Sequence, residues 1–253
     1  MQNDNNPFKA PTAQVADLPP DSGDFIAGGR SVPAGNGLAW LGGAWELFRA
    51  APGIWIGLCV AYLLLMVVLG MIPLVNFLLG LLAPVFAGGI MIGCKALDDG
   101  DELTIGHLFA GFSGHAGNLF LVGLIYMAGV VGVVLLMLLI GGGIGFSLFV
   151  SGAVSPMAMI VPILVACLLI VPLAMAVWYA PALVVFHQQT PFEAMKASFF
   201  VSIKNFLPFL VYSLVIIVLA ILASLPFFLG WLVLIPVLQA SIYVSYKDMF
   251  TES

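Results

Sequence analysis

Long apolar runs alternate with short polar segments along most of this chain. Six runs carry no Asp, Glu, Lys or Arg and consist largely of Leu, Val, Ile, Ala, Gly and Phe: residues 54–72, 74–94, 119–140, 160–187, 206–224 and 226–246. An α-helix needs about 20 apolar residues to cross the hydrocarbon core of a bilayer. The pattern therefore predicts six membrane-crossing helices.

The six runs come in pairs, and each pair follows a shorter amphipathic segment. The predicted fold is therefore an all-α polytopic membrane protein, with six transmembrane helices arranged as three hairpins that each follow a short lead-in helix. The hairpin units are expected at about 38–97, 104–189 and 191–250, within one membrane domain of residues 38–250. The uncharged stretch 119–186 is long enough for three crossings as well as two, so both alternatives stay open there.

The lead-in segment at residues 190–205 is the best defined of the three. Thr190 can cap the helix, Pro191 suits its first turn, and Glu193 can complete a capping box. Four apolar side chains then share one helical face: Phe192, Met195, Phe199 and Ile203. We expect this segment either to lie in the membrane interface with that face in the acyl boundary, or to extend the next span.

Two twelve-residue segments resemble each other at the ends of the first and third hairpins. Residues 84–95 read PVFAGGIMIGCK and residues 236–247 read PVLQASIYVSYK. Small residues four positions apart allow close helix contact, and an internal proline kinks a helix. We therefore predict helix-packing positions at Gly89, Gly93, Ser241, Ser245, Pro84, Pro181 and Pro236.

Composition excludes an ordinary soluble domain. The chain of 253 residues is 62% hydrophobic and 8% charged, whereas soluble domains carry about 25% charged residues. Most of the surface must therefore face lipid. No Lys/Arg cluster indicates a nucleic-acid partner. The three cysteines lie far apart within apolar runs, which indicates packing rather than redox chemistry or metal binding.

Residues 1–37 differ from the rest of the chain. Proline and charged residues are frequent there, and large apolar residues are few. Such a segment cannot bury enough apolar surface to fold alone, so we predict a disordered cytoplasmic tail. It also lacks the basic start, apolar run and small-residue cleavage site of a signal peptide.

The charged residues all fall on one side of the predicted topology. They occupy the tail, the lead-in segments, the connections between hairpins and the C-terminus, whereas the three turns inside the hairpins carry none. Cytoplasmic loops are enriched in Lys and Arg. Because all 7 Lys and Arg residues share one side, we expect a multi-pass protein of a bacterial inner membrane with both termini in the cytoplasm. The acidic segment 95–102, KALDDGDE, is interpreted as a solvated loop on that side.

Two patterns could carry chemistry, and neither is favoured. GFSG at residues 111–114 resembles the Gly-x-Ser-Gly motif of rhomboid proteases, which would make Ser113 the nucleophile and His187 the base. However, Ser113 falls in an interfacial connection, and the sequence around His187 does not match that family. His107, His115 and the nearby acids lack the spacing of a helical zinc pair or an EF-hand. We therefore expect no catalytic residue, no metal site and no cofactor.

Two segments carry a resemblance to known proteins. NPFKAP at residues 6–11 and YAPALVVFHQQTPFEAMKASF at residues 179–199 resemble a family of proteobacterial six-span inner-membrane proteins, whose cytoplasmic tails contain an Asn-Pro-aromatic motif. The layout of lead-in plus hairpin is more distantly similar to the membrane domain of glycerophosphodiester phosphodiesterases. The resemblance implies a six-span inner-membrane protein and implies no site residue.

The predicted spans hold few polar groups. No charge lies inside them, although ion-coupled transporters usually keep a titratable group at that depth. Weak candidates for the border of a polar cavity are Gln239, Asn76 and Ser213. The favoured hypothesis is a non-enzymatic membrane factor that binds membrane lipids, other inner-membrane proteins or a second copy of itself. A transporter or channel for a small or amphiphilic solute is the alternative.

Overall fold

The regular structure of the chain is helical, as predicted. The computed structural model describes residues 25–151 and 156–252, with side chains left out at 73–78 and 144–159. In chain order the elements are α1 (Asn36–Ala50), α2 (Pro52–Gly70), α3 (Pro73–Asp98), the 3-10 helix η1 (Ile105–Phe112), α4 (Ala116–Ser151), α5 (Pro156–Trp178), α6 (Ala180–His187), α7 (Pro191–Lys204), α8 (Phe206–Ser224) and α9 (Trp231–Phe250).

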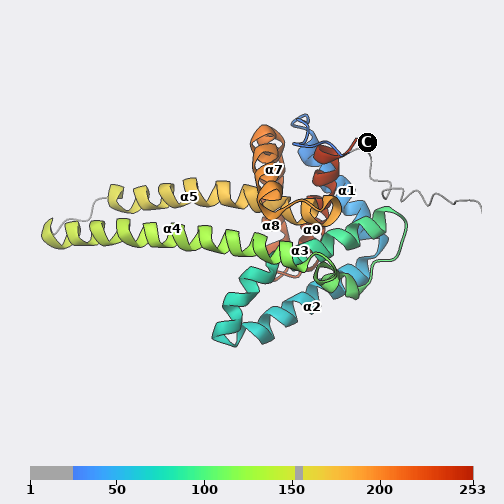
Figure 1. Ribbon diagram of the computed structural model, residues 1–253, viewed down its shortest axis with the longest axis horizontal. Coiled ribbons are helices and arrows are strands. Elements are labelled where there is room, and N and C mark those ends of the chain that lie inside the picture. The colour runs from blue at the N-terminus through green and yellow to red at the C-terminus, as the bar shows by residue number, and fades with distance from the viewer. Residues whose placement is uncertain (1–24, 152–155, 253) are drawn as a thin grey trace, which may run out of the picture.

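The molecule consists of a body and projecting arms (Figure 1). The body comprises α1, η1, α6, α7 and the C-terminal halves of α3 and α9, and it holds most of the large buried side chains. The arms are α2, α4, α5 and α8, whose large apolar side chains are mostly exposed. Apolar surface of this extent is stable only in a non-aqueous solvent, so the arms identify a membrane protein.

Five of the described helices are long and apolar enough to cross a membrane: Pro52–Gly70, Leu79–Asp98, Ala116–Gly143, Ile160–His187 and Phe206–Ser224. The predicted sixth span corresponds to α9, which is not among them because serines, Gln239 and Lys247 lower its apolar character. Two of these five helices, Ala116–Gly143 and Ile160–His187, cover the stretch 119–186. The described helices therefore favour two crossings over three in this stretch.

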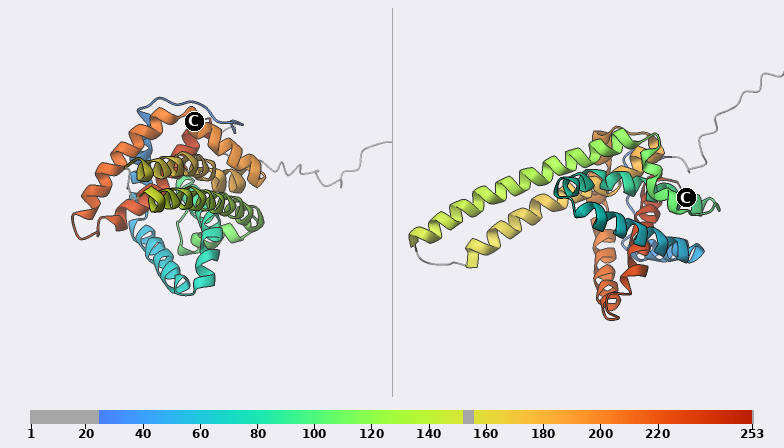
Figure 2. Two further views of the ribbon diagram at one scale, coloured as in Figure 1. Left: turned by 90° about the vertical axis from the view of Figure 1, so that its left-hand side faces the viewer. Right: turned by 90° about the horizontal axis from the view of Figure 1, so that it is seen from below.

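The arms do not run parallel to one another. Figure 2 shows the pair α4–α5 leaving the body in one direction and the pair α8–α9 in another. The α4–α5 pair is also the longest: α4 has 36 residues, which at 1.5 Å per residue gives about 54 Å. The described arms therefore diverge from the body instead of closing into one bundle.

Local sequence signals set several helix ends. Pro191 lies in the first turn of α7, and Thr190 and Glu193 form the predicted capping box, with 2.7 Å between Thr190 Oγ1 and Glu193 Oε2. These three assignments are confirmed. The helix ends at Lys204, and α8 begins at Phe206, so α7 is a separate helix rather than an extension of the next span.

The predicted apolar face of α7 is divided between two environments. Met195 is buried, whereas Phe192 and Ile203 are exposed. The buried face instead consists of small and medium side chains at helical spacing: Ala194, Met195, Ser198, Val201 and Ser202. Small residues allow α7 to lie close to the body, and they leave its aromatic side chains on the outer surface.

The predicted disordered tail extends too far along the chain. Residues 25–35, which we call the N-terminal strap, lie across the end of α9: the backbone N–H of Arg30 donates to Met249 O at 2.8 Å, and that of Ile26 donates to Phe250 O at 2.9 Å. Gly29 has φ +67°, and a Cβ there would come within 2.1 Å of Val201 Cγ2. A glycine is thus required on both counts. Residues 1–24 lie outside the described part.

Candidate functional site

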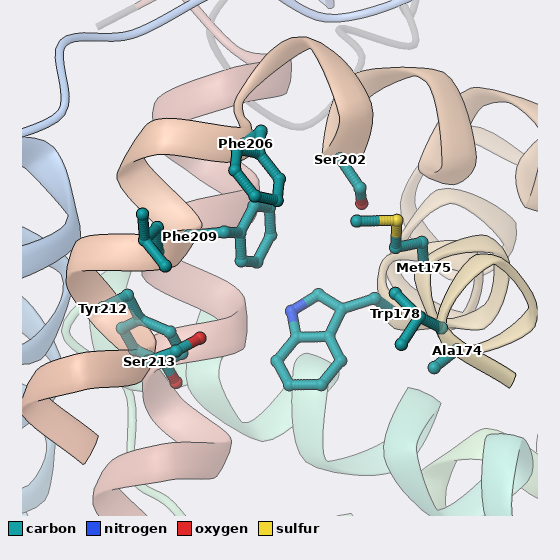
Figure 3. A pocket seen from close by; sticks show the side chains of 10 residues that line it. Ala174, Met175, Trp178, Ser202, Phe206, Phe209, Tyr212 and Ser213 are labelled. Carbon is teal, nitrogen blue, oxygen red and sulfur yellow. The ribbon is translucent and has the colours of Figure 1, made fainter. Parts of the chain in front are cut away.

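An apolar crevice lies where α5, α7 and α8 meet (Figure 3). Trp178 is the last residue of α5, Phe206 is the first of α8, and Ser202 lies near the C-terminal end of α7. The crevice therefore lies at the end of α5 and the start of α8, beside the body. Its volume is about 310 Å³, and its walls are Val171, Ala174, Met175, Trp178, Ser202, Phe206, Phe209, Leu210, Tyr212 and Ser213.

Aromatic side chains shape the crevice. The indole of Trp178 extends between α5 and α8, with Phe206 and Phe209 facing it across the opening (Figure 3). The rings of Trp178 and Phe209 meet edge to face, with centroids 6.3 Å apart and an interplanar angle of 84°. Trp178 is 38% exposed. Its ring therefore forms one wall of the crevice and does not close the opening.

The polar atoms around the crevice are largely used within the protein. Ser202 Oγ donates to Ser198 O at 2.7 Å. The hydroxyl of Tyr212 is hydrogen-bonded to Ser241 Oγ on α9. None of the wall residues carries a charge. The surface therefore presents hydrocarbon and aromatic faces to whatever enters, which favours an apolar occupant over a polar solute.

Ser241 and Ser245 were predicted as small residues that allow close helix contact. In the structure their hydroxyls also form hydrogen bonds with tyrosines. Both serines are buried. Tyr179 donates its hydroxyl to Ser245 Oγ at 2.9 Å, while its backbone N–H donates to Ser198 Oγ at 2.9 Å. These bonds join α9, α7 and the break between α5 and α6. Buried hydroxyls are costly unless paired, so the pairs fix how these elements dock.

The glycines of the matching segment do make close contacts. A Cβ at Gly89 would lie 2.4 Å from His107 O, and one at Gly93 would lie 2.7 Å from Leu103 Cδ1. Their partner is η1 and the residues before it, a lead-in segment, rather than another span. Gly111 of η1 completes the contact, because a Cβ there would lie 2.0 Å from Val85 O.

The three predicted prolines occupy two kinds of position. Pro84 and Pro236 are buried inside the continuous helices α3 and α9. Pro181 lies instead in the first turn of α6, after the chain breaks at Tyr179. Of the polar cavity candidates, Ser213 lines the crevice and Gln239 is half-buried on α9. The side chain of Asn76 lies outside the described part.

Asp248 is the centre of a polar cluster that the sequence did not reveal. Its carboxylate accepts from Trp40 Nε1 at 2.7 Å and from Asn36 Nδ2 at 2.8 Å, and it forms an ion pair with Arg30 at 3.4 Å. Asn205 adds a second link, because its Oδ1 accepts from the Val32 N–H at 2.8 Å. The cluster fastens the N-terminal strap and α1 to α9.

The acidic segment 95–102 is only partly the solvated loop that was expected. Asp98 accepts from the hydroxyl of Tyr243 at 2.9 Å and forms an ion pair with Lys247. Lys95 pairs with Asp99 one turn further along the helix, at 2.8 Å. Asp101 and Glu102 are exposed. The segment therefore joins the ends of α3 and α9.

The residues weighed for catalysis lie in separate settings. Ser113 is exposed at the end of η1. The ring of His187 stacks on Phe25 with centroids 3.7 Å apart, and its Nε2 is hydrogen-bonded to Tyr246 rather than to Ser113. His107 Nδ1 accepts from the Thr104 N–H at 3.0 Å. His187 and His107 are thus held by contacts within the fold.

Trp178, Met175 and Phe209 were not singled out from the sequence. One signal could have found Trp178, because Trp is enriched where spans reach the interface. Nothing local marks Phe209, since it becomes a wall residue only because the fold brings its ring to that of Trp178.

Comparison with known proteins supports a membrane protein. The chain is 28% identical over 225 residues to a protein of Burkholderia thailandensis named as a probable inner membrane protein, and the alignment covers 84% of this chain and 82% of that one. No protein-family model matches the chain, and no solved structure does. The expected similarity to the membrane domain of glycerophosphodiester phosphodiesterases is not shown. Together, the apolar arms and this relative describe a membrane-embedded helical protein.

Proposed function

We propose that this chain is a multi-pass protein of a bacterial inner membrane, with both termini in the cytoplasm, that acts without a catalytic centre by binding membrane lipids or other membrane proteins. The observation that carries this proposal is the apolar crevice between two candidate spans, Ile160–His187 and Phe206–Ser224, beside exposed apolar helices. The named relative from Burkholderia thailandensis supports the inner membrane as the location.

The clustering of charges supports the topology. Arg30 pairs with Asp248, Lys247 pairs with Asp98, and Lys204 Nζ donates to Gly29 O at 2.9 Å. These contacts gather the charged segments at the body, away from the tips of the arms. Because Lys and Arg near span ends mark the cytoplasmic side, the body faces the cytoplasm and α9 forms the sixth span of three lead-in and hairpin units.

All three hairpins must share one bilayer in this proposal. Three of the four arms leave the body at a short break in the helices: Ala51 before α2, Tyr179 at the end of α5, and Asn205 before α8. Few side chains bury the arms beyond these breaks. In this proposal the arms turn to a common direction in the bilayer, and these breaks are the positions that can absorb the change without unfolding the helices.

Binding is favoured over transport by the chemistry of the crevice. A transporter is expected to show a polar cavity bordered by residues such as Gln239 or Ser213. Ser213 does line the crevice, but its neighbours are Trp178, Phe209 and Leu210. Gln239 is not part of its wall. An apolar wall supports lipid or helix contact and offers little to replace the hydration of a polar solute.

A pair of reporter fusions tests the topology. An alkaline phosphatase reporter placed after residue 155 should be active, because the connection between α4 and α5 is assigned to the periplasm. The same reporter after residue 253 should be inactive, while a fluorescent protein at that site should fold in the cytoplasm. A cytoplasmic signal after residue 155 would contradict the multi-pass arrangement.

A crosslinking experiment tests the activity. The tagged full chain is crosslinked in native membranes and purified, and the bound lipids and proteins are compared with those of an unrelated multi-pass protein expressed at the same level. We expect at least one lipid class or membrane protein to be enriched with this chain. Equal recovery of every lipid and protein from both would remove the basis for a binding role.

A further inference from the structure

The break between α5 and α6 is bridged by a side chain from a third helix. Ser198 of α7 accepts a hydrogen bond from the Tyr179 N–H at 2.9 Å, and its own hydroxyl donates to Met175 O at 2.6 Å. In a continuous α-helix each N–H donates to the carbonyl four residues earlier, so Tyr179 and Met175 would bond directly. The Ser198 hydroxyl therefore connects two backbone groups that bond to each other in an unbroken helix.

A side chain inserted into the hydrogen-bond ladder is a recognised cause of a sharp bend in a helix. We propose that the Ser198 hydroxyl, which we call the latch, holds a hinge at Tyr179 in its bent state. With α7 docked, the helix is interrupted, as the structure shows. With the latch released, α5 and α6 join into one helix over residues 156–187. This inference goes beyond the proposed binding role, and it does not depend on which helices cross the membrane.

Pro181 contributes to the break but does not explain it alone. A proline has no N–H to donate, so the carbonyl of Val177 loses its usual partner four residues on. Other prolines of this chain nevertheless lie inside helices that continue past them: Pro84 in α3, Pro162 and Pro172 in α5, and Pro236 in α9. The break at Tyr179 combines a nearby proline with the inserted hydroxyl of Ser198.

The straight state is close to the bent one in backbone conformation. Tyr179 has φ −106° and ψ −6°, whereas helical residues lie near −63° and −42°. Rotations of about 40° at each of these two bonds therefore bring Tyr179 into the helix. No residue needs to leave the allowed region during this change.

Both states also satisfy the same polar groups. In the bent state, Ser198 bonds to the Tyr179 N–H and to Met175 O. In the straight state those two groups bond to each other, and the freed hydroxyl can donate to the carbonyl of Ala194, four residues earlier in α7. Ser202 already makes the equivalent bond, to Ser198 O at 2.7 Å. Because neither state leaves one of these buried groups unpaired, the two differ little in hydrogen bonding.

The two sides of the hinge are anchored unequally. The Tyr179 hydroxyl donates to Ser245 Oγ at 2.9 Å, and Leu183 of α6 is buried, so this side belongs to the body. None of the described side chains of α5 is buried. The packing of α5 on α4 opposes straightening, because Leu173 lies so close that a Cβ at Gly129 would come within 2.8 Å of its Cδ1. We therefore expect α5 to be the moving part and the straight state to be the minor one.

The hinge adjoins the apolar crevice. Met175 and Trp178 form part of its α5 wall, and Phe209 faces them from α8. A change in the direction of α5 therefore moves one wall of the crevice relative to the other. The latch thus couples the position of α7 to the shape of the crevice.

Distance measurements by double electron–electron resonance in lipid nanodiscs test the hinge. The full chain carries one spin label at Cys167, an exposed position of α5, and one at Asp101→Cys, an exposed position of the body. Cys59 and Cys94 are replaced by alanine. At 1.5 Å per residue, α5 extends about 18 Å from Tyr179 to Cys167. A bend of about 40° therefore moves the label by about 10 Å, and a second distance that differs by about 5 Å or more should mark the straight state.

Two serines on the buried face of α7 provide the variant and its matched control. Ser198→Ala removes the latch and leaves two buried backbone groups unpaired in the bent state, so the population at the second distance should rise about tenfold or more. Ser202→Ala makes the same change one turn later, where the hydroxyl bonds within α7. It should leave the distances unchanged.

Pro181→Ala tests the hinge from the other side and stays informative if Ser198→Ala does not fold. It supplies an N–H that can donate to Val177 O only when the helix is continuous. The same second distance should therefore gain population while Ser198 is still present. The double variant should show the largest straight population.

The outcomes separate a hinge from general loosening. A shared second distance in Ser198→Ala and Pro181→Ala, absent from Ser202→Ala, supports the proposal. The unchanged distance in both of the first two variants would overturn it, because packing would then fix α5 without the latch. Equal changes in Ser198→Ala and Ser202→Ala would also overturn it, since displacement of α7 as a whole would explain them. The binding role is tested separately by lipid and protein enrichment, and none of these distances decides it.

Discussion

The body and the arms both consist largely of apolar residues, yet their helices have different surroundings: protein in the body and lipid around the arms. In α9, Ser241 pairs with Tyr212 of α8, Ser245 pairs with Tyr179 at the start of α6, and half of the residues are buried. In α8, Pro208 and Tyr212 are the buried residues among nineteen. A helix surrounded by protein must place its polar groups in specific pairs, whereas a helix surrounded by lipid needs only to be apolar. The hydropathy of the sequence therefore identifies the lipid-facing arms, but it underestimates how deeply the helices of the body are buried.

Two glycines on one helix give the largest expected difference between the regions. A Cβ at Gly123, near the body, would lie 2.2 Å from Leu81 O, whereas a Cβ at Gly132, further along α4, meets nothing within 4 Å. Gly123→Ala should lower the free energy of unfolding by about 3 kcal/mol, because backbone atoms must separate. Gly132→Ala should leave it unchanged or raise it by up to about 1 kcal/mol.

Unfolding of the detergent-solubilised protein, followed by circular dichroism, measures both glycine variants. If the two substitutions had equal effects, the distinction between a tightly packed body and loosely packed arms would be wrong at the level of this helix. Wild-type stability for Gly123→Ala alone would show that α3 and α4 can move apart without cost.

Removal of the Asp248 carboxylate tests how much its polar contacts stabilise the body. Asp248→Ala removes the acceptor for Trp40, Asn36 and Arg30, and it should lower the free energy of unfolding by about 2 kcal/mol, since partly buried donors lose a charged partner. The N-terminal strap should also open more often, so trypsin should cut after Arg30 about tenfold faster or more.

The matched control for Asp248 is Asp101→Ala, which removes an exposed carboxylate from the acidic segment. We expect no change in cleavage after Arg30 and less than about 0.5 kcal/mol change in stability. Equal sensitivity of the two variants to trypsin would mean that the N-terminal strap is not held by the Asp248 cluster.

A double-mutant cycle on Tyr179 and Ser245 tests a smaller contribution to stability, that of one hydrogen bond. Tyr179→Phe and Ser245→Ala each break the 2.9 Å hydrogen bond between α9 and the end of α5. We expect a coupling free energy of about 1 kcal/mol, which is typical of hydrogen bonds between membrane helices. A coupling near zero would show that shape, rather than pairing, determines how α9 docks.

The parts of the fold that the sequence predicted correctly are local. The capping box at Thr190 and Glu193 needs only residues three positions apart. Five of the predicted spans were found from length and composition alone. Each of these signals is contained within one helix or one turn.

The parts that the sequence did not predict depend on distant partners. The N-terminal strap reads as disordered because its own residues cannot form a core, yet Arg30 and Asp248 meet across 218 residues. Met195 was placed on the same apolar face as Phe192, but packing against the body buried one and left the other exposed. The crevice has the same origin, because Ser202, Trp178 and Phe209 come from three helices.

The contact between the N-terminal strap and the end of α9 also sets the order of assembly during synthesis. Arg30 leaves the ribosome early, whereas its partner Asp248 comes 218 residues later, which at 5–20 residues per second is a delay of about 10 to 45 s. Until then the strap has no α9 to bind, so its closure should be among the last steps of folding. A protease that recognises residues 25–35 in extended form would thus distinguish finished molecules from incomplete ones.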